Sequence, residues 1–249
     1  MKIVLVGYGE VGESVYHVIT KQTKRGVWIH DPVKKLDYPR DRGDVDLMLI
    51  AIPYSHEFID IVKQYQKEWK VKETIIFSTV AIGTSRQCDA VHSLIDAPHP
   101  TMAFYILNSP RWVGGQLGEF GRQLFKEVGF ILCELDTPEQ SEFLKLRSLM
   151  YYGMAIEFAR YSKRISDELG LIYDCVKKYD QDYNRINAMF GRFHLQRYVL
   201  DPPKGRIGGH CIIQNLPLLH KEFPHPFGGY IIHKDIELEK EEKEDAISK

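Results

Sequence analysis

The sequence has no excess of charge of either sign. Lysine plus arginine number 33 and aspartate plus glutamate number 34, so the formal net charge is −1. A protein that neutralises a nucleic acid backbone needs a basic surplus, and we therefore expect no nucleic acid partner. No apolar run approaches the ~20 residues of a membrane span, and no basic segment precedes the first apolar run, as it would in a secretory signal. We expect a soluble, cytoplasmic protein without a membrane partner.

Cysteine is also scarce and lacks the spacing that would give it a structural task. The four cysteines lie far apart with no CxxC pair, at Cys88, Cys133, Cys175 and Cys211. A disulfide framework or a zinc site needs such clustering. The sequence therefore predicts no metal site, and a reducing compartment suits it.

The first 135 residues alternate short β-branched apolar runs with amphipathic stretches. This alternation is typical of parallel strands joined by crossover helices. The expected strands cover Lys2 to Val6, Val27 to His30, Leu47 to Ile52, Thr74 to Phe77, His92 to Asp96, and Phe130 to Cys133. We predict an α/β fold with a Rossmann-type, doubly wound parallel sheet.

A long helix is expected after this region. Thr137 can cap it, Pro138 suits its first turn, and Gln140 can complete a capping box. No proline follows until well beyond Gly170, which is a plausible end. A second helical segment is expected from Leu171 to Leu200.

These patterns divide the chain into three parts. We expect an NAD-binding Rossmann domain over 1–135, a helical central and dimerisation domain over 136–222, and a charged tail over 223–249 that is frayed or disordered. We expect fraying or disorder in the tail because acidic residues and lysines dominate its end and leave few apolar groups to pack.

A glycine-rich turn follows the first expected strand. Gly7, Gly9 and Gly12 form G-x-G-x-x-G before an amphipathic stretch, a pattern that brings a helix N-terminus to a pyrophosphate. Asp31 ends the second strand, 19 residues beyond Gly12, where a carboxylate can accept the ribose hydroxyls and repel a 2′-phosphate. The combination predicts NAD rather than NADP as cofactor. The alternative is a glycine turn with a helix-capping aspartate and no ligand.

Two glycines precede a histidine and a cysteine in the run Arg206-Ile207-Gly208-Gly209-His210-Cys211-Ile212. This stretch resembles the G-G-H-C signature of the UDP-glucose and GDP-mannose dehydrogenase family. Ser78-Thr79-Val80 with Gly83-Thr84 resembles the family's S-T-V-x-x-G-T, and Arg111 to Gly115 resembles its R-x-V-x-G turn. Glu142 to Lys145 matches the register of the family's long central helix, with Lys145 in place of its catalytic lysine.

The resemblance implies a chemistry for these residues. Cys211 would attack an aldehyde formed in a first hydride transfer, the thiohemiacetal would lose a second hydride to NAD, and Lys145 would stabilise the oxyanion. His210 and Asn215 are further candidates for the catalytic set, and Thr79 joins Gly7, Gly9, Gly12 and Asp31 as a candidate cofactor residue. The family's corresponding long helix lies at a dimer core, which predicts a homodimer through Pro138 to Leu169.

The chain also departs from the family. Leu149 stands where the family has an asparagine, Asn215 where it has an aspartate, and His99 where the glutamate of its N-P-E stretch aligns best. The sequence after Cys211 is too short for the family's third, nucleotide-sugar domain, so the small-molecule substrate is an unspecified alcohol or sugar derivative. Two alternatives stay open: a two-electron hydroxyacid-type dehydrogenase that uses Lys145, and an NAD-binding regulatory protein whose catalysis has lapsed.

Overall fold

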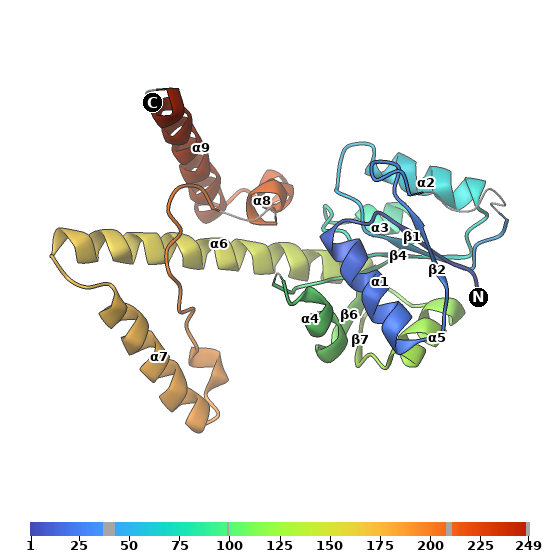
Figure 1. Cartoon of the computed structure of the whole chain (residues 1–249), viewed down its shortest axis with the longest axis horizontal. Coiled ribbons are helices and arrows are strands. Elements are labelled where there is room, and N and C mark those ends of the chain that lie inside the picture. Colours follow the sequence, from blue (N-terminus) through green and yellow to red (C-terminus); the bar gives the residue numbers. More distant parts are fainter. Residues whose placement is uncertain (37–42, 99, 208–210, 248–249) are drawn as a thin grey trace. The chain divides into compact units, whose positions relative to one another are not determined.

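The computed structural model describes residues 1–36, 43–98, 100–207 and 211–247 (Figure 1). The chain forms two compact units, residues 1–147 and 148–249, and the boundary falls within the long helix α6 (Pro138–Glu168). Each unit is described by itself below. The functional boundaries expected near residues 135 and 222 stay predictions.

The first unit contains a seven-stranded sheet. Its strands are β1 (Ile3–Val6), β2 (Val27–His30), β3 (Leu47–Ile50), β4 (Glu73–Ile76), β5 (Val91–Ser93), β6 (Arg111–Gly114) and β7 (Leu132–Leu135). Their order across the sheet is β2-β1-β3-β4-β5-β6-β7. Strands β1 to β5 are parallel to one another. The expected α/β fold with a doubly wound sheet is confirmed.

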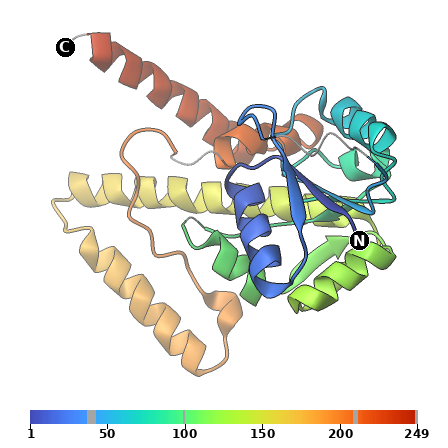
Figure 2. The same ribbon diagram turned by 45° about the vertical axis from the view of Figure 1, so that its right-hand side comes forward.

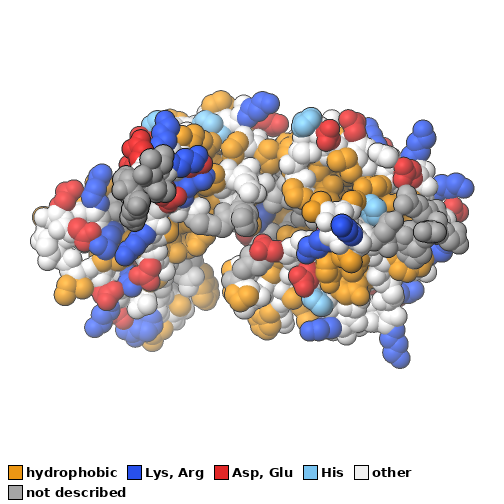
Figure 3. Space-filling view, turned by 45° about the horizontal axis from the view of Figure 1, so that its top comes forward, with side chains coloured by type: hydrophobic (Ala, Val, Ile, Leu, Met, Phe, Trp, Pro, Cys, Tyr) orange, Lys and Arg blue, Asp and Glu red, His pale blue; other side chains and the backbone are white. Residues whose placement is uncertain are grey.

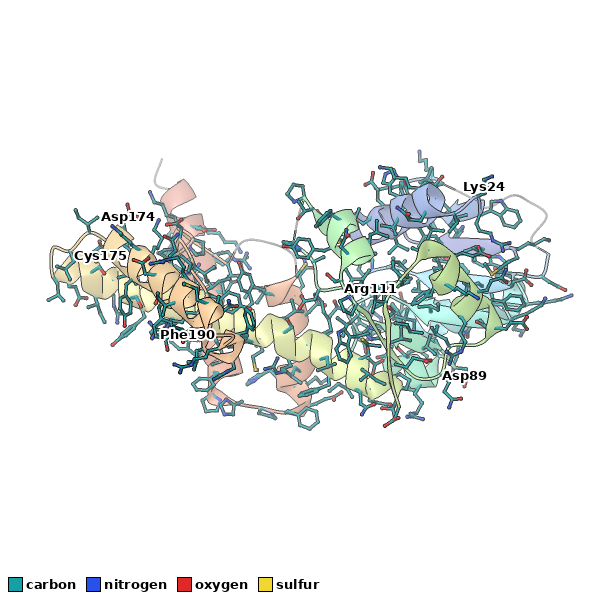
Figure 4. All side chains as sticks on the ribbon, turned by 90° about the horizontal axis from the view of Figure 1, so that it is seen from below. Lys24, Asp89, Arg111, Asp174, Cys175 and Phe190 are labelled. Carbon is teal, nitrogen blue, oxygen red and sulfur yellow. The ribbon has the colours of Figure 1, made fainter. Side chains whose placement is uncertain are left out.

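Strand β6 is the one that the sequence did not predict. It pairs antiparallel with β5, with His92 opposite Gly114 and Ser93 opposite Val113, and parallel with β7. The expectation of a turn over Arg111 to Gly115 is therefore wrong for Arg111–Gly114. The apolar run that marks the other strands is interrupted here by Arg111, whose side chain is buried (Figure 4).

Helices cover both faces of this sheet (Figures 1 and 2). Side chains alternate along a strand, so Ile3 and Leu5 pack on one face while Val4 and Val6 pack on the other. The first face carries α1 (Glu10–Gln22), α4 (Met102–Asn108) and α5 (Glu119–Val128). The second carries α2 (Phe58–Glu68) and α3 (Thr84–Gln87).

Strand β1 marks the point where the strand order reverses. The chain passes from β1 to β2 on one side and then crosses to β3 on the other. In open α/β sheets ligands bind at such a switch point, outside the carboxyl ends of the strands. The glycine turn that begins at Gly7 directly follows β1 at this edge.

Helix α6 begins and ends close to the expected residues. The backbone N–H of Thr137 donates to Gln140 Oε1 at 3.0 Å, one half of the expected capping box. At the other end Gly170 has a φ of +67°, and the Leu171 N–H donates to the Ser166 carbonyl at 2.7 Å, the bond that closes a Schellman turn. The predicted long helix is confirmed over 31 residues.

Two buried polar side chains fasten the first turns of α6 to the sheet. Glu142 accepts the backbone N–H groups of Gly83 at 2.6 Å and Ser85 at 2.7 Å. His92, on β5, lies 2.8 Å from the Ser141 hydroxyl and 3.1 Å from the Ser78 carbonyl. Because a carbonyl can only accept, His92 Nε2 carries the proton and Nδ1 accepts from Ser141.

The second unit is helical. After the C-terminal part of α6 come α7 (Asp174–Met189), η1 (Phe193–Leu195), α8 (Ile212–Glu222) and α9 (Pro226–Ile247). Its core consists of Leu149, Ile156, Ile207, Ile212, Leu216 and Ile231. Residues 223–249, expected as a charged tail, thus include a helix with buried side chains. Among the described residues no helix is both long and apolar enough to cross a membrane.

The buried His92 predicts a pH-dependent stability. Burial, and to a smaller extent the Lys145 charge, lowers the pKa of His92 from 6.5 to about 4. Below pH 6.5 the unfolded chain binds a proton that the folded chain does not, so the free energy of unfolding falls as the pH drops from 6.5 to 4, by at most about 3 kcal/mol. Urea unfolding of wild type and His92→Gln between pH 7 and 4 measures this difference. Equal pH slopes in the two proteins would contradict it.

Candidate functional site

Two glycines of the turn after β1 are required by the fold itself. Gly7 has a φ of +90°, and a Cβ there would overlap the backbone carbonyl of Ala51. A Cβ on Gly12 would overlap the carbonyl oxygen of Gly7. Gly7 thus lets the chain turn beside β3, and Gly12 lets α1 lie close against the turn.

Gly9 is different, because the protein leaves room for a side chain there. It is the N-cap residue of α1 with a φ of −76°, and beyond its two chain neighbours no atom lies within 4 Å of where its Cβ would be. It supplies no side-chain cap to the helix. Neither backbone strain nor packing requires glycine at this position, whereas close approach of a ligand to the helix N-terminus would.

Asp31 lies directly beside this turn. Its Oδ2 accepts the Tyr8 N–H at 2.8 Å and its Oδ1 accepts the Lys34 N–H at 3.0 Å. Burial alone raises the pKa of Asp31, but the N–H donors of Lys34, Tyr8 and Val33, with the Lys34 charge, lower it more, so the net pKa lies below its usual value. Asp31 is therefore an ionised acceptor of three backbone N–H groups, and the roughly four acceptor positions of a carboxylate leave room for one further donor.

Lys34 is a neighbour that the sequence did not point to. Its Nζ donates to the Tyr8 carbonyl at 2.5 Å and lies 5.4 Å from the centre of the Tyr8 ring. A cation thus stands at the rim of the glycine turn, opposite in charge to Asp31. Lys34 is three residues after Asp31 in the sequence, and no motif in the sequence includes it.

Lys145 and Asp96 form a second polar group in the first unit. Lys145 Nζ lies 3.3 Å from Asp96 Oδ1, with the lysine side chain 11% exposed and the aspartate 51% exposed. Asp96 comes just after β5, at the carboxyl edge of the parallel strands. Lys145 and the glycine turn therefore belong to the same edge of one sheet.

The sequence did not single out Asp96 as a partner of the lysine. Its position at the end of an expected strand was the available signal, because polar residues at the carboxyl ends of parallel strands are typical of sites. Thr79 lies three residues beyond β4 at this edge and is half-buried. Glu142 and His92 contribute indirectly, because their hydrogen bonds fix the part of α6 that carries Lys145.

The remaining candidates belong to the second unit or lie outside the description. Cys211 is exposed and is the N-cap residue of α8, and Asn215 Nδ2 donates to the Cys211 carbonyl at 2.8 Å. Asn215 is thus engaged with backbone, and its amide does not contact the thiol through this bond. Leu149, the departure from the family's asparagine, packs in the core of this unit. His210 and His99 lie outside the described residues.

Comparison with known proteins finds likeness in structure only. No protein-family model and no curated protein matches the chain. A UDP-glucose dehydrogenase from Pyrobaculum islandicum superposes with a TM-score of 0.70 at 12% identity, over 96% of this chain and 68% of that one. A UDP-D-ManNAc dehydrogenase from Pyrococcus horikoshii gives 0.68 at 14% identity, over the same shares.

A shorter dehydrogenase matches over nearly its whole length. The 3-hydroxyisobutyrate dehydrogenase of Mycobacterium tuberculosis gives a TM-score of 0.65 at 12% identity, over 95% of this chain and 92% of that one. The chain shares the fold of these dehydrogenases. At such identities the likeness is one of fold.

The glycine turn predicts losses of stability of different size for two matched substitutions. Gly12→Ala should destabilise the protein by about 1–3 kcal/mol, because the new methyl group must displace the Gly7 carbonyl. Gly9→Ala should cost less than about 1 kcal/mol, since only the preference for glycine over alanine at an N-cap is lost. Urea unfolding of both variants tests this, and equal losses of stability would contradict it.

Proposed function

We propose that this protein is an NAD-dependent dehydrogenase that oxidises an alcohol or sugar derivative. The observation that carries the proposal is the arrangement at one sheet edge. A glycine turn with an open position at Gly9 and an ionised Asp31 lies at the switch point, and the Lys145 and Asp96 pair lies at the same edge. This is where a doubly wound sheet binds ligands.

The residues at the switch point fit a dinucleotide. The space at Gly9 admits a pyrophosphate to the N-terminus of α1, whose partial positive charge favours an anion. The remaining acceptor position of Asp31 can take a hydrogen bond from a ribose hydroxyl, and its negative charge disfavours a 2′-phosphate. Thr79, beyond β4, is a further candidate contact. Bound NAD would supply the hydride acceptor.

The Lys145 and Asp96 pair can manage the proton of the reaction. Oxidation of an alcohol to a carbonyl releases a hydride from carbon and a proton from oxygen. The exposed Asp96 carboxylate can accept that proton, and the Lys145 ammonium can stabilise the negative charge that develops on the oxygen. This proton transfer involves only these two side chains and the substrate hydroxyl, and the hydride goes to NAD.

Cys211 carries the finer part of the proposal. In the resembled family a cysteine in this position takes the aldehyde product through a second oxidation, and the exposure of Cys211 leaves its thiol accessible. The competing assignment is a two-electron hydroxyacid-type reaction on Lys145, in which Cys211 has no role. A lapsed, NAD-binding regulatory protein is the third possibility, and it would bind cofactor without turnover.

We propose further that two copies associate through α6. Hydrophobic side chains reach the surface of the chain in several places (Figure 3). On the second unit the large exposed ones include Phe158 on α6, Ile172 before α7 and Phe190 after it, the last of which is labelled in Figure 4. Such a concentration of exposed apolar groups is typical of an interface. Light scattering should give twice the chain mass of 28.9 kDa at micromolar concentration. A monomer mass there would contradict the dimer.

The cofactor assignment predicts tighter binding of NAD than of NADP. Asp31→Ala should weaken NAD binding about tenfold or more, because charge-assisted hydrogen bonds to the ribose are lost, and should reduce the preference between the cofactors. Gly9→Ala should weaken binding of both. Calorimetric titration measures each affinity, with Asp44→Ala, at an exposed acid of the same unit, as the control. Equal or tighter binding of NADP by wild type would overturn the role of Asp31.

The catalytic assignment predicts that Lys145→Met and Asp96→Asn each lower kcat by about 100-fold or more without changing NAD affinity. Lys163→Met, also on α6 but in an exposed ion pair with Asp167, is the control and should have wild-type activity. The assay uses panels of 3-hydroxy acids and nucleotide sugars. Unchanged kcat in the Lys145 variant would contradict the assignment, and NAD binding without turnover of any substrate would favour the regulatory alternative.

The number of NADH molecules formed per substrate separates the two dehydrogenase mechanisms. A second oxidation through Cys211 gives two NADH per substrate in wild type and one, or none, in Cys211→Ala. A two-electron reaction gives one NADH in both proteins.

A further inference from the structure

The chain just before Cys211 is held by a buried ion pair from α9. Asp235 is 1% exposed, and its Oδ2 accepts Arg206 Nε at 3.0 Å and Nη2 at 2.7 Å. Its Oδ1 accepts the backbone N–H of Ile207 at 3.0 Å. One carboxylate thus binds the side chain of one residue and the backbone of the next.

Two further contacts restrain the same segment. The Arg206 N–H donates to Glu242 Oε1 at 3.1 Å, from the last turns of α9. The Gly205 carbonyl accepts a hydrogen bond from Arg160 on α6, and Arg160 is itself paired with Glu157. Gly205 has a φ of +70°, and a Cβ on it would overlap the Glu242 carboxylate. Residues 205–207 therefore lie between α6 and α9.

The residue that follows Cys211 in the chain, Ile212, is also held in place. Ile212 and Ile207 are both buried in the core cluster of the second unit. Four residues of chain from Ile207 to Cys211 reach at most ~14 Å. A constraint on Ile207 therefore limits where the thiol of Cys211 can lie.

The ion pair between Arg206 and Asp235 is not explained by a gain in stability. A bidentate pair with one partner fully buried is costly in desolvation and adds little net stability compared with an apolar contact. It does, however, define direction and register, because Arg206 Nε and Nη2 both donate to one oxygen of Asp235 while its other oxygen accepts the Ile207 N–H.

We propose that Asp235 is a positioning residue for Cys211, which acts by holding Arg206 and Ile207 in the chain before it. The proposal rests on the proposed catalytic role of Cys211, which gives the positioning its use. Helix α9 is then part of the site's support, through a carboxylate that reaches Arg206 and Ile207 together. Asp235→Asn keeps an acceptor for the Ile207 N–H but turns N–H groups toward Arg206, which breaks the pair.

The test measures local order at both ends of this stretch in the full chain, without cofactor or substrate. Amide exchange of Ile207 should be about tenfold faster in Asp235→Asn than in wild type, the factor expected from weakening a charge-assisted hydrogen bond. A nitroxide on Cys211, in a Cys133→Ser, Cys175→Ser background, should become more mobile. Cys88 stays unlabelled, because burial raises the pKa of its thiol to about 11.

Two controls separate positioning from general destabilisation. Glu237→Gln removes an equal charge from the same helix at an exposed position and should change neither measurement. A nitroxide on Cys175, at the start of α7 (Figure 4), in a Cys133→Ser, Cys211→Ser background, should keep its mobility in Asp235→Asn. If Asp235→Asn does not fold, Arg206→Lys, which keeps the charge but loses the fork, takes its place and should show the same changes at smaller size.

The proposal is overturned if a folded Asp235→Asn, or Arg206→Lys in its place, leaves Ile207 exchange and Cys211 mobility as in Glu237→Gln. These measurements do not depend on turnover. A lack of dehydrogenase activity would therefore count against the proposed function and leave this result standing.

Discussion

The attachment of α6 to the sheet is the contact on which the candidate site depends. Glu142 accepts two backbone N–H groups of the turn at Gly83 and Ser85, and His92 joins Ser141 to the Ser78 carbonyl. Gly83 is half-buried and the other groups are buried, and burial raises the pKa of Glu142 while lowering that of His92. Buried polar groups with several partners are costly to displace. The first turns of α6 are therefore fixed in one orientation about the helix axis, and this orientation places Lys145 beside Asp96.

Charge in the two units serves different ends. In the first unit Asp31, Lys34, Lys145 and Asp96 lie at the carboxyl edge of the sheet; Lys34 and Asp96 are exposed, whereas Asp31 and Lys145 are buried. In the second unit the buried carboxylates of Glu157 and Asp235 are used up in holding backbone and arginine side chains before Cys211. The proposed dehydrogenase chemistry needs the first kind of group to touch substrate and cofactor, and the second kind to keep a loop in place.

The departures from the resembled family acquire partial explanations. Leu149 has no polar task, because it contributes to the core of the second unit, and an asparagine there would need a buried partner. Asn215 bonds to the Cys211 carbonyl, a local contact between residues one helical turn apart. Asp96 is the acid that lies beside Lys145, although the alignment of the sequence pointed to His99 for the acidic position. An acidic group near the lysine is thus present at a different residue.

The sequence by itself determined the local features: the alternation of strands and helices, the glycine turn with Asp31, and the cap and stop of α6. These depend on residues within a few positions of one another, where spacing and backbone preference decide the outcome. Only the tertiary structure decided the antiparallel β6, the pairing of Lys145 with Asp96, and the burial of Asp235 against Arg206, because each joins segments with no fixed spacing in the chain. The charged end of the chain shows the reason most clearly. Its composition favours disorder, yet Asp235 on α9 is buried and paired with Arg206, which composition alone cannot reveal.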